Sequence, residues 1–238
     1  WLGWLSFPCR SGDNGWTVTL LFFIPSRFRV LCSLNFLCAL FLGLSLLNSS
    51  AVPTVGGPRG SLAIHDPSTI IKYKGRYYIY GTGPGILSKS SDDGVLWKDG
   101  PAVFATAPAW VIGAAPGFNG DFWAPDIAFI NGKYCLYYSV SSWGSQQSGI
   151  GLVTNPTLDP TDPNYLWTDQ GIVIQSFNGS SYNTIDPCVT FDASGNPWLA
   201  FGSYWNGIYL VQLDPITGKR IGPSSTLTQL AYNSSIEA

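Results

Sequence analysis

Three segments of the chain repeat one pattern of apolar and polar positions. Each begins with an aspartate next to a proline, continues as a short apolar run, turns at a glycine and ends in a run rich in aromatic residues. The segments are residues 66–81, 125–138 and 186–202. Two such runs joined by a glycine-containing turn are typical of a β-hairpin. We therefore expect each segment to form a hairpin.

The aspartates that open these segments, Asp66, Asp126 and Asp186, are 60 residues apart. A repeat of this length with several short strands in each unit predicts an all-β fold, a β-propeller in which each unit is one blade. The innermost strands of a propeller converge on its axis, so we expect the three carboxylates to face one central funnel. Glu237 follows Asp186 after 51 residues, where a fourth blade is expected to begin.

The repeat therefore predicts about three blades and the start of a fourth. A closed propeller has at least four blades. The chain also lacks Met, even at position 1. We expect the sequence to be a carboxy-terminally truncated piece of a longer protein.

The most apolar stretch, residues 30–47, follows a short basic segment and precedes a run of small residues. That order predicts a secretory signal peptide at residues 26–51, with cleavage near Ala51. A membrane anchor is the alternative. It is disfavoured because a spanning helix needs about 20 apolar residues, and Asn35 interrupts this stretch.

Two further parts of the chain follow from this assignment. Residues 1–25 show no coherent pattern and are interpreted as sequence upstream of the signal peptide. Residues 52–238 are then the incomplete propeller, which we expect to be extracellular, with no membrane contact after cleavage.

Composition narrows the class of partner. The chain has 12 Lys and Arg residues against 14 Asp and Glu, a net charge of −2, which argues against nucleic-acid binding. Charged residues make up only 11% and aromatic residues 15%, with ten Trp. Ordinary domains carry roughly 25% charged residues. This balance favours a folded protein with a carbohydrate-like partner.

The cysteine pattern leaves one pairing open. Only Cys135 and Cys188 lie beyond the predicted signal peptide. A secreted protein permits a disulfide between them, but both lie in apolar strand-like runs, where buried free thiols are common. Free thiols are the favoured interpretation. No Cys/His cluster has the spacing of metal ligands.

Three carboxylates in one funnel suit the hydrolysis of a glycosidic bond. One carboxyl group donates a proton to the leaving oxygen, and another activates water or attacks directly. A third, placed nearby, raises the pKa of the acid by like-charge repulsion. A single Asp-Pro pair also has a structural interpretation as a turn cap, but three carboxylates in phase favour a site.

Five motifs occur in the order of a known family. They are His65-Asp66-Pro67-Ser68, Phe122-Trp123-Ala124-Pro125-Asp126-Ile127, Tyr182-Asn183-Thr184-Ile185-Asp186-Pro187, Phe201-Gly202-Ser203-Tyr204-Trp205-Asn206-Gly207-Ile208 and Ser235-Ile236-Glu237-Ala238. Together they resemble the endo-arabinanases of glycoside hydrolase family 43 over residues 63–238. The resemblance implies a five-bladed propeller and a secreted, monomeric enzyme. It would cleave internal α-1,5 bonds of arabinan, a pectin side chain of plant cell walls, with inversion.

The resemblance also implies roles for individual residues. Asp66 matches the general base, Glu237 the general acid, and Asp186 the carboxylate that tunes the pKa of the acid and orients it. For inversion, Asp66 and Glu237 would lie roughly 6.5–9.5 Å apart. Asp126 resembles a residue lining the same pocket, and a structural hydrogen-bonding role is an equal alternative. The implied substrate contacts are Asp66, Trp123, Asp126, Gly144, Asn183, Thr184, Ile185, Asp186, Ser203, Tyr204 and Trp205.

Some matters stay open at this stage. The family often holds a structural calcium ion with a histidine in its shell, but His65 is the only histidine, so no metal ligand is assigned in this chain.

An exo-acting α-L-arabinofuranosidase or β-xylosidase of the same family is one alternative function, because loops decide between an open groove and a closed pocket. A non-catalytic sugar-binding propeller fragment is another, disfavoured by the presence of all three catalytic candidates.

Overall fold

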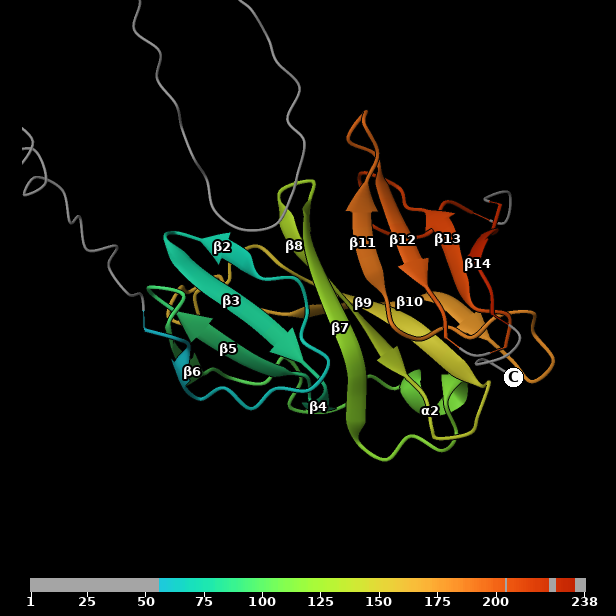
Figure 1. Cartoon of the computed structure of the whole chain (residues 1–238), viewed down its shortest axis with the longest axis horizontal. Helices are drawn as coiled ribbons and strands as arrows, with labels where there is room; N and C mark the ends of the chain where they lie inside the picture. Colours follow the sequence, from blue (N-terminus) through green and yellow to red (C-terminus); the bar gives the residue numbers. More distant parts are fainter. Residues whose placement is uncertain (1–55, 204, 223–225, 234–238) are drawn as a thin grey trace, which may run out of the picture. The chain divides into compact units, whose positions relative to one another are not determined.

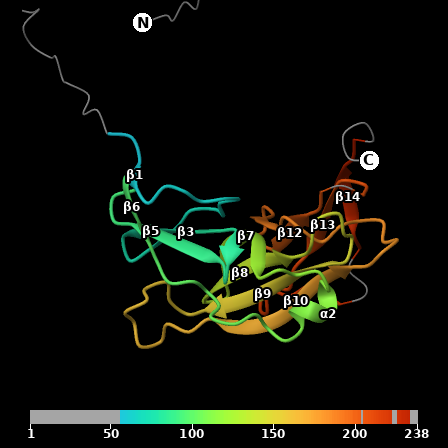
Figure 2. The same cartoon turned by 90° about the horizontal axis from the view of Figure 1, so that it is seen from below.

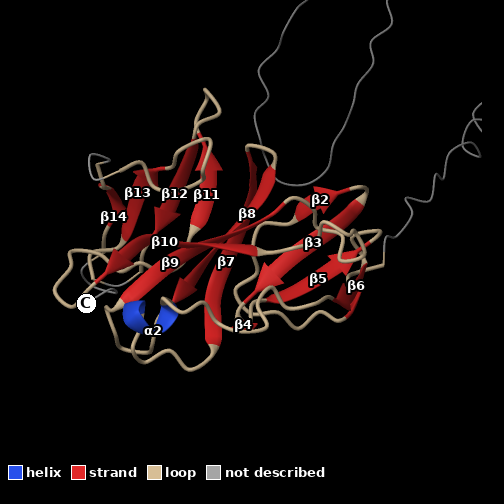
Figure 3. Ribbon diagram, turned by 180° about the vertical axis from the view of Figure 1, so that it is seen from behind, coloured by secondary structure: helices blue, strands red, loops and turns tan. Residues whose placement is uncertain are grey.

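The computed structural model describes residues 56–203, 205–222 and 226–233. The predicted signal peptide, the segment before it, Tyr204 and Glu237 lie outside these residues. Within the described part, three β-sheets follow one another along the chain (Figure 1). One short helix, α2 (Val111–Ala114), packs against the second sheet (Figures 2 and 3). No helix among these residues has the length and apolar character needed to cross a membrane.

Each sheet contains a four-stranded antiparallel meander in chain order. The first sheet comprises β1 (Arg59–Gly60), β2 (Ile71–Tyr73), β3 (Arg76–Gly81), β5 (Leu87–Ser91) and β6 (Leu96–Asp99). The second comprises β4 (Gly83–Pro84), β7 (Asp121–Ile130), β8 (Lys133–Val140), β9 (Ser148–Asn155) and β10 (Thr168–Ser176). The third comprises β11 (Cys188–Phe191), β12 (Pro197–Phe201), β13 (Ile208–Gln212) and β14 (Thr228–Ala231). The all-β prediction with three propeller blades is confirmed.

The three predicted hairpins are the pairs β2/β3, β7/β8 and β11/β12. Two of them turn over two residues, at Lys74-Gly75 and Asn131-Gly132, and all four of these residues have positive φ. Two positive φ angles define the type I′ turn, whose twist matches that of the flanking strands. Glycine at the second position adopts its positive φ without steric cost, because it has no Cβ atom.

The second blade is buried on both faces, as its strand β8 shows. Tyr134, Leu136 and Tyr138 pack into a core shared with the first blade. The intervening Cys135 and Tyr137 pack into a second core, shared with the third blade. Because successive side chains of a strand point to opposite faces, a continuous apolar run fits a sheet between two others.

In the second blade, the residue equivalent to Asp66 and Asp186 is Ala124, two residues before the position that the 60-residue spacing predicts. Asp66, Ala124 and Asp186 each precede a proline and each have positive φ, at 44°, 34° and 55°. Asp126 comes after its proline, so its equivalents are Ser68 and Cys188. The prediction that Asp126 occupies the same blade position as Asp66 and Asp186 is therefore wrong. The residue before proline, held in an uncommon conformation, marks the repeat instead.

Asp126 joins all three blades at the centre of the molecule. It lies on β7, is 4% exposed, and accepts hydrogen bonds from two other blades. The N–H of Thr69 donates to its Oδ1 at 2.9 Å, and the N–H of Val189 donates to its Oδ2 at 2.7 Å. The structure thus gives Asp126 the structural role that the sequence left as an alternative.

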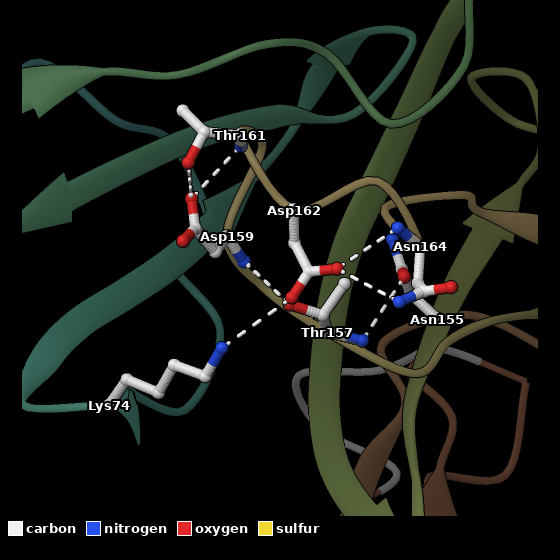
Figure 4. A network of polar contacts seen from close by, with 7 residues as sticks. All are labelled: Lys74, Asn155, Thr157, Asp159, Thr161, Asp162 and Asn164. Atoms are coloured by element: carbon white, nitrogen blue, oxygen red, sulfur yellow. Dashed lines mark hydrogen bonds and ion pairs between the residues drawn. The ribbon is translucent and has the colours of Figure 1, made fainter.

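A second polar network ties the loop between β9 and β10 to the first blade (Figure 4). Oδ1 of the buried Asn155 accepts the N–H groups of two residues of this loop, and Asp159 and Asp162 each accept the N–H of the residue two positions later. Lys74, in the β2–β3 turn, lies 3.5 Å from Asp162. The loop is ordered by its own side chains.

The central role of Asp126 is testable by substitution. Asp126→Ala leaves the N–H groups of Thr69 and Val189 without their acceptor. Each unpaired buried group costs about 1–3 kcal/mol. We expect the free energy of unfolding to fall by about 2–6 kcal/mol, measured by urea denaturation. Asp126→Asn is the matched control: it keeps one acceptor oxygen and should lose less. Equal stability of Asp126→Ala and the parent protein would contradict this role.

Candidate active site

A cavity of about 230 Å³ opens where the three blades meet. Asp66, Asp126 and Asp186 all line it, so the structure brings the three carboxylates together as the propeller geometry predicts. The other walls are Pro67, Ser68, Thr69, Ala124, Pro125, Pro187 and Cys188. Because Asp126 uses both oxygens to bind backbone N–H groups, Asp66 and Asp186 are the carboxylates available for chemistry among the described residues.

Asp66 is held by two neighbours at one oxygen. The hydroxyl of Thr82 donates to Oδ2 at 2.8 Å, and Nδ1 of His65 lies 2.7 Å from the same atom. A carboxylate only accepts hydrogen bonds, which places the imidazole proton on Nδ1. Thr82 is itself fixed, since its Oγ1 accepts the N–H of Ala124 at 2.8 Å. The carboxylate plane therefore has a defined orientation.

Asp186 has an environment that favours its neutral form. Its N–H donates to Oγ of Ser139 at 2.9 Å, which anchors the backbone to the second blade. The residue reaches solvent at the cavity mouth, yet the cavity walls desolvate its carboxyl group. That burial and, second, the negative charge of Asp66 raise the pKa of Asp186 from 3.8 to about 6. Desolvation and like charge both penalise the ionised form.

A second, larger cavity of about 350 Å³ has an aromatic lining. Its lining residues are Trp123, Ser141, Ser142, Trp143, Gly144, Ser145, Asn183, Ile185 and Trp205. The two cavities meet along the chain, because Trp123 precedes Ala124 and Ile185 precedes Asp186. Five positions that the resemblance implied as substrate contacts thus lie together beside the carboxylates.

Trp143 is a residue that the sequence reasoning missed. It is 90% exposed, and its ring centroid lies 5.2 Å from that of Trp123. A tryptophan in a β-protein is usually taken as core, so only the neighbouring Gly144 was named. The signal available in the sequence was the run of small residues around it, Ser141-Ser142 and Gly144-Ser145, which predicts a loop. In the structure Gly144 has φ of 73°, and the turn leaves the indole outside the core.

Asn183 lines the aromatic cavity and carries an unpaired acceptor. The residue is 2% exposed, and its Oδ1, which is shielded from solvent, has no hydrogen-bond partner among the described atoms. Unpaired buried polar atoms are rare in folded proteins. Asn183 is therefore a lining residue whose hydrogen-bonding capacity is not fully used.

Two other predicted contacts differ from the expectation. Thr184 is fully buried, and its hydroxyl donates to the carbonyl of Ser148 at 2.7 Å, so it supports the segment rather than a ligand. Ser203 is half-buried and borders neither cavity. Tyr204 and Glu237 lie outside the described residues, so the separation of Asp66 and Glu237 stays a prediction.

The cysteine and metal expectations can be compared with the described residues. Cys135 and Cys188 are free thiols, the first buried and the second exposed. No group of three or more His, Cys, Asp or Glu side chains in the described ranges is placed to hold a metal ion. These residues therefore do not by themselves fit the calcium ion that the resemblance implied.

Comparisons with known proteins agree on one family. Residues 58–236 match glycosyl hydrolases family 43. The chain is 42% identical over 187 residues to the extracellular endo-α-(1→5)-L-arabinanase 1 of Bacillus subtilis, covering 76% of this chain and 56% of that protein. It is 42% identical over 152 residues to the extracellular exo-α-(1→5)-L-arabinofuranosidase ArbA of Cellvibrio japonicus, covering 63% and 44%. The chain thus spans about half the length of these curated relatives.

Solved structures give the same result. The native Bacillus subtilis arabinanase superposes with a TM-score of 0.68 at 40% identity, covering 75% of this chain and 60% of that one. The Cellvibrio cellulosa α-L-arabinanase complexed with arabinohexaose gives 0.69 at 37% identity, covering 74% and 56%. Both are five-bladed β-propellers, which confirms that the three sheets are blades of that fold.

The coupling between Asp66 and Asp186 predicts a measurable titration. In the parent protein, the carboxyl carbon of Asp186 should titrate with a pKa of about 6. Asp66→Asn removes the like charge, so the pKa of Asp186 should fall. It should stay above 3.8 because burial is the larger cause. The measurement is a pH titration by NMR of protein with ¹³C-labelled aspartate. An unchanged Asp186 pKa in Asp66→Asn would contradict the coupling.

The same raised pKa predicts how stability depends on pH. Below about pH 4 the Asp186 carboxyl is neutral in both the folded and the unfolded state. As pH rises from 4 to 6, the unfolded state loses this proton first, so the folded state becomes less stable. Asp186→Asn should therefore raise the melting temperature at pH 8 and change it little at pH 4. A larger gain at pH 4 would contradict the sign.

Proposed function

The chain belongs to glycosyl hydrolases family 43, and on this premise we propose that the protein cleaves internal α-1,5-L-arabinofuranosidic bonds of arabinan with inversion. One observation carries the proposal: the cavity lined by Asp66 and Asp186 has chain neighbours, Trp123 and Ile185, in the lining of a second cavity that holds three tryptophans. Relatives named as endo-arabinanases support the choice of substrate.

Asp66 is proposed as the general base. An inverting reaction needs a carboxylate that removes a proton from water as the water attacks the anomeric carbon. Thr82 and His65 both bind Oδ2, and no described residue bonds Oδ1. The second oxygen is thus free to accept the proton. The cavity of about 230 Å³ has room for the attacking water, which occupies about 30 Å³ in the liquid.

Glu237 and Asp186 are proposed to act as a pair. Glu237 donates its proton to the leaving glycosidic oxygen. Asp186, when ionised, raises the pKa of that acid by like-charge repulsion and orients it. Because the pKa of Asp186 is itself about 6, this assistance should grow as the pH rises through that value.

The aromatic cavity is proposed to bind the arabinose units that flank the cleaved bond. Trp123, Trp143 and Trp205 present flat apolar surfaces for the carbon-bound hydrogens of a furanose ring. Asn183 lines the same cavity and carries an unpaired acceptor. Apolar walls with a few placed polar groups are the usual make-up of a ligand site.

We further propose that the protein is a secreted monomer. The apolar segment at 26–51 supports export, and relatives at 42% identity are named extracellular. Calcium stays a proposal for the whole protein, and none of the steps above passes through a metal ion.

An exo-acting α-L-arabinofuranosidase is the second candidate. It is favoured by the relative from Cellvibrio japonicus, which is named an exo-enzyme at the same 42% identity, and by a solved exo-1,5-α-L-arabinanase at 42% identity. The two activities share the carboxylates. They differ in whether the bound substrate can extend beyond the site at both ends, as in a groove, or at one end only, as in a pocket.

Hydrolysis of linear arabinan is the deciding assay. The full-length protein should release oligomers early in the reaction, whereas release of arabinose alone would favour the exo alternative. Asp66→Asn and Glu237→Gln should lower kcat/KM by about 10²- to 10⁴-fold, the usual contribution of a general acid or base. Their folding is checked by circular dichroism. Full activity in either variant would contradict its assigned role.

Trp143 provides a test of the aromatic cavity. Trp143→Ala should raise KM for arabinan by about 2- to 12-fold, since a well-placed aromatic contact contributes about 0.5–1.5 kcal/mol. Trp143→Phe keeps a ring and should retain part of the affinity. Because the side chain is exposed, the melting temperature should not change. An unaltered KM in Trp143→Ala would remove Trp143 from the binding site.

A further inference from the structure

Equivalent hydroxyl groups connect successive blades beside the active site. Thr82 pairs with His65, and Ser139 holds the equivalent place opposite Trp123 in the second blade. Oγ1 of Thr82 accepts the N–H of Ala124, just as Oγ of Ser139 accepts the N–H of Asp186. Each hydroxyl thus fixes the residue of positive φ in the next blade.

The third blade cannot carry the same group. Its equivalent residue is Gly202, whose N–H bonds the carbonyl of Ile185 as that of Thr82 bonds His65. A Cβ atom at Gly202 would lie 2.3 Å from the carbonyl oxygen of Gly207. Close passage of the backbone requires glycine here, so among the described blades only the first two have the hydroxyl.

Thr82 makes one contact that Ser139 does not. A hydroxyl has a single proton, and Oγ1 of Thr82 already accepts from Ala124. Its proton is therefore directed to Oδ2 of Asp66, 2.8 Å away. The second blade orients Thr82, and Thr82 in turn orients the carboxylate.

We propose that Thr82 is a positioning residue for Asp66, and that its hydroxyl holds the carboxylate in one orientation. A hydrogen bond donated to a charged acceptor is shorter and stronger than one between neutral groups. The inference rests on the proposed function only in taking Asp66 as the base. The hydroxyl does not titrate, so its support is the same at every working pH.

The other groups around Asp66 act differently. His65 contacts the same oxygen from the adjacent position and is mostly exposed. Asp186 faces Asp66 from the third blade, and Asp126 and Cys188 share the cavity. Asp126 and Asp186 are acidic and cannot donate a hydrogen bond to Asp66 when they are ionised. The Thr82 hydroxyl is therefore the neutral donor that the first blade supplies.

The test compares Thr82→Val with Thr82→Ser. Valine keeps the shape and removes the donor, so kcat/KM for arabinan should fall by about 10- to 100-fold, as expected for a hydrogen bond to a charged group. The loss should fall on kcat, and the Asp66 carboxylate should no longer keep a single orientation in a crystal structure of the variant. Serine restores the donor and should restore both. A Thr82→Val enzyme with the parental kcat and the parental Asp66 orientation would overturn the inference.

Ser139→Ala is the matched control. It removes the equivalent bond between blades, at Asp186, without touching the carboxylate of Asp66. It should lower the melting temperature as Thr82→Val does and leave the Asp66 carboxylate in its single orientation. Loss of that orientation in Ser139→Ala, to the same extent as in Thr82→Val, would show that loosened blades alone explain the effect, and the inference would fail.

A structural comparison without substrate separates this inference from the proposed function. In crystal structures, the Asp66 carboxylate should take one orientation in the parent, set by the Thr82 hydroxyl, and more than one in Thr82→Val. The same single orientation in both would overturn the inference, even if arabinan is hydrolysed. An inactive parent whose Asp66 loses its single orientation in Thr82→Val would refute only the proposed function. If Thr82→Val folds poorly, Thr82→Cys, with its weak donor, replaces it, and an Asp66 that keeps the parental orientation there would overturn the inference.

Discussion

The fold and the site both depend on hydrogen bonds between blades at the centre of the molecule, above all those accepted by the carboxylate of Asp126. One buried side chain binds the backbone of the first and third blades. Each of its two oxygens thus fixes one neighbouring blade relative to β7. A charged acceptor is buried at low cost only when its hydrogen bonds are made. The walls of the carboxylate cavity are thus fixed before any ligand binds.

Two hydroxyl groups also form hydrogen bonds between neighbouring blades, beside the carboxylate cavity. Thr82 and Ser139 each accept an N–H from the next blade, so two residues with unfavourable backbone angles, Ala124 and Asp186, are held from a neighbouring sheet. Strain of this kind persists only where the surroundings over-determine it. Here the surroundings are the blades themselves, and the result is a site built on strands with little freedom to move.

The two cavities differ in polarity. Like charges crowd the first, where burial and Asp66 raise the pKa of Asp186 to about 6. The second is walled by exposed aromatic rings, of which Trp143 is 90% exposed. An exposed indole of this size is expensive in water and is typical of a surface kept for a partner. The proposed proton transfer and the proposed sugar binding are thus assigned to two distinct surfaces.

The sequence by itself determined the strands, their hairpins, the propeller and the convergence of the carboxylates, because short apolar runs and glycine turns are local signals that repeat. The 60-residue spacing did not give the correct phase of the second blade. Asp126 and Asp66 look equivalent by spacing, and the positive φ of Ala124 shows that the residue before the proline is the equivalent one. Likewise the roles of Thr82, Thr184 and Trp143 depend on contacts between residues distant in the chain. Such contacts exist only once the blades pack, which is why tertiary structure alone decided them.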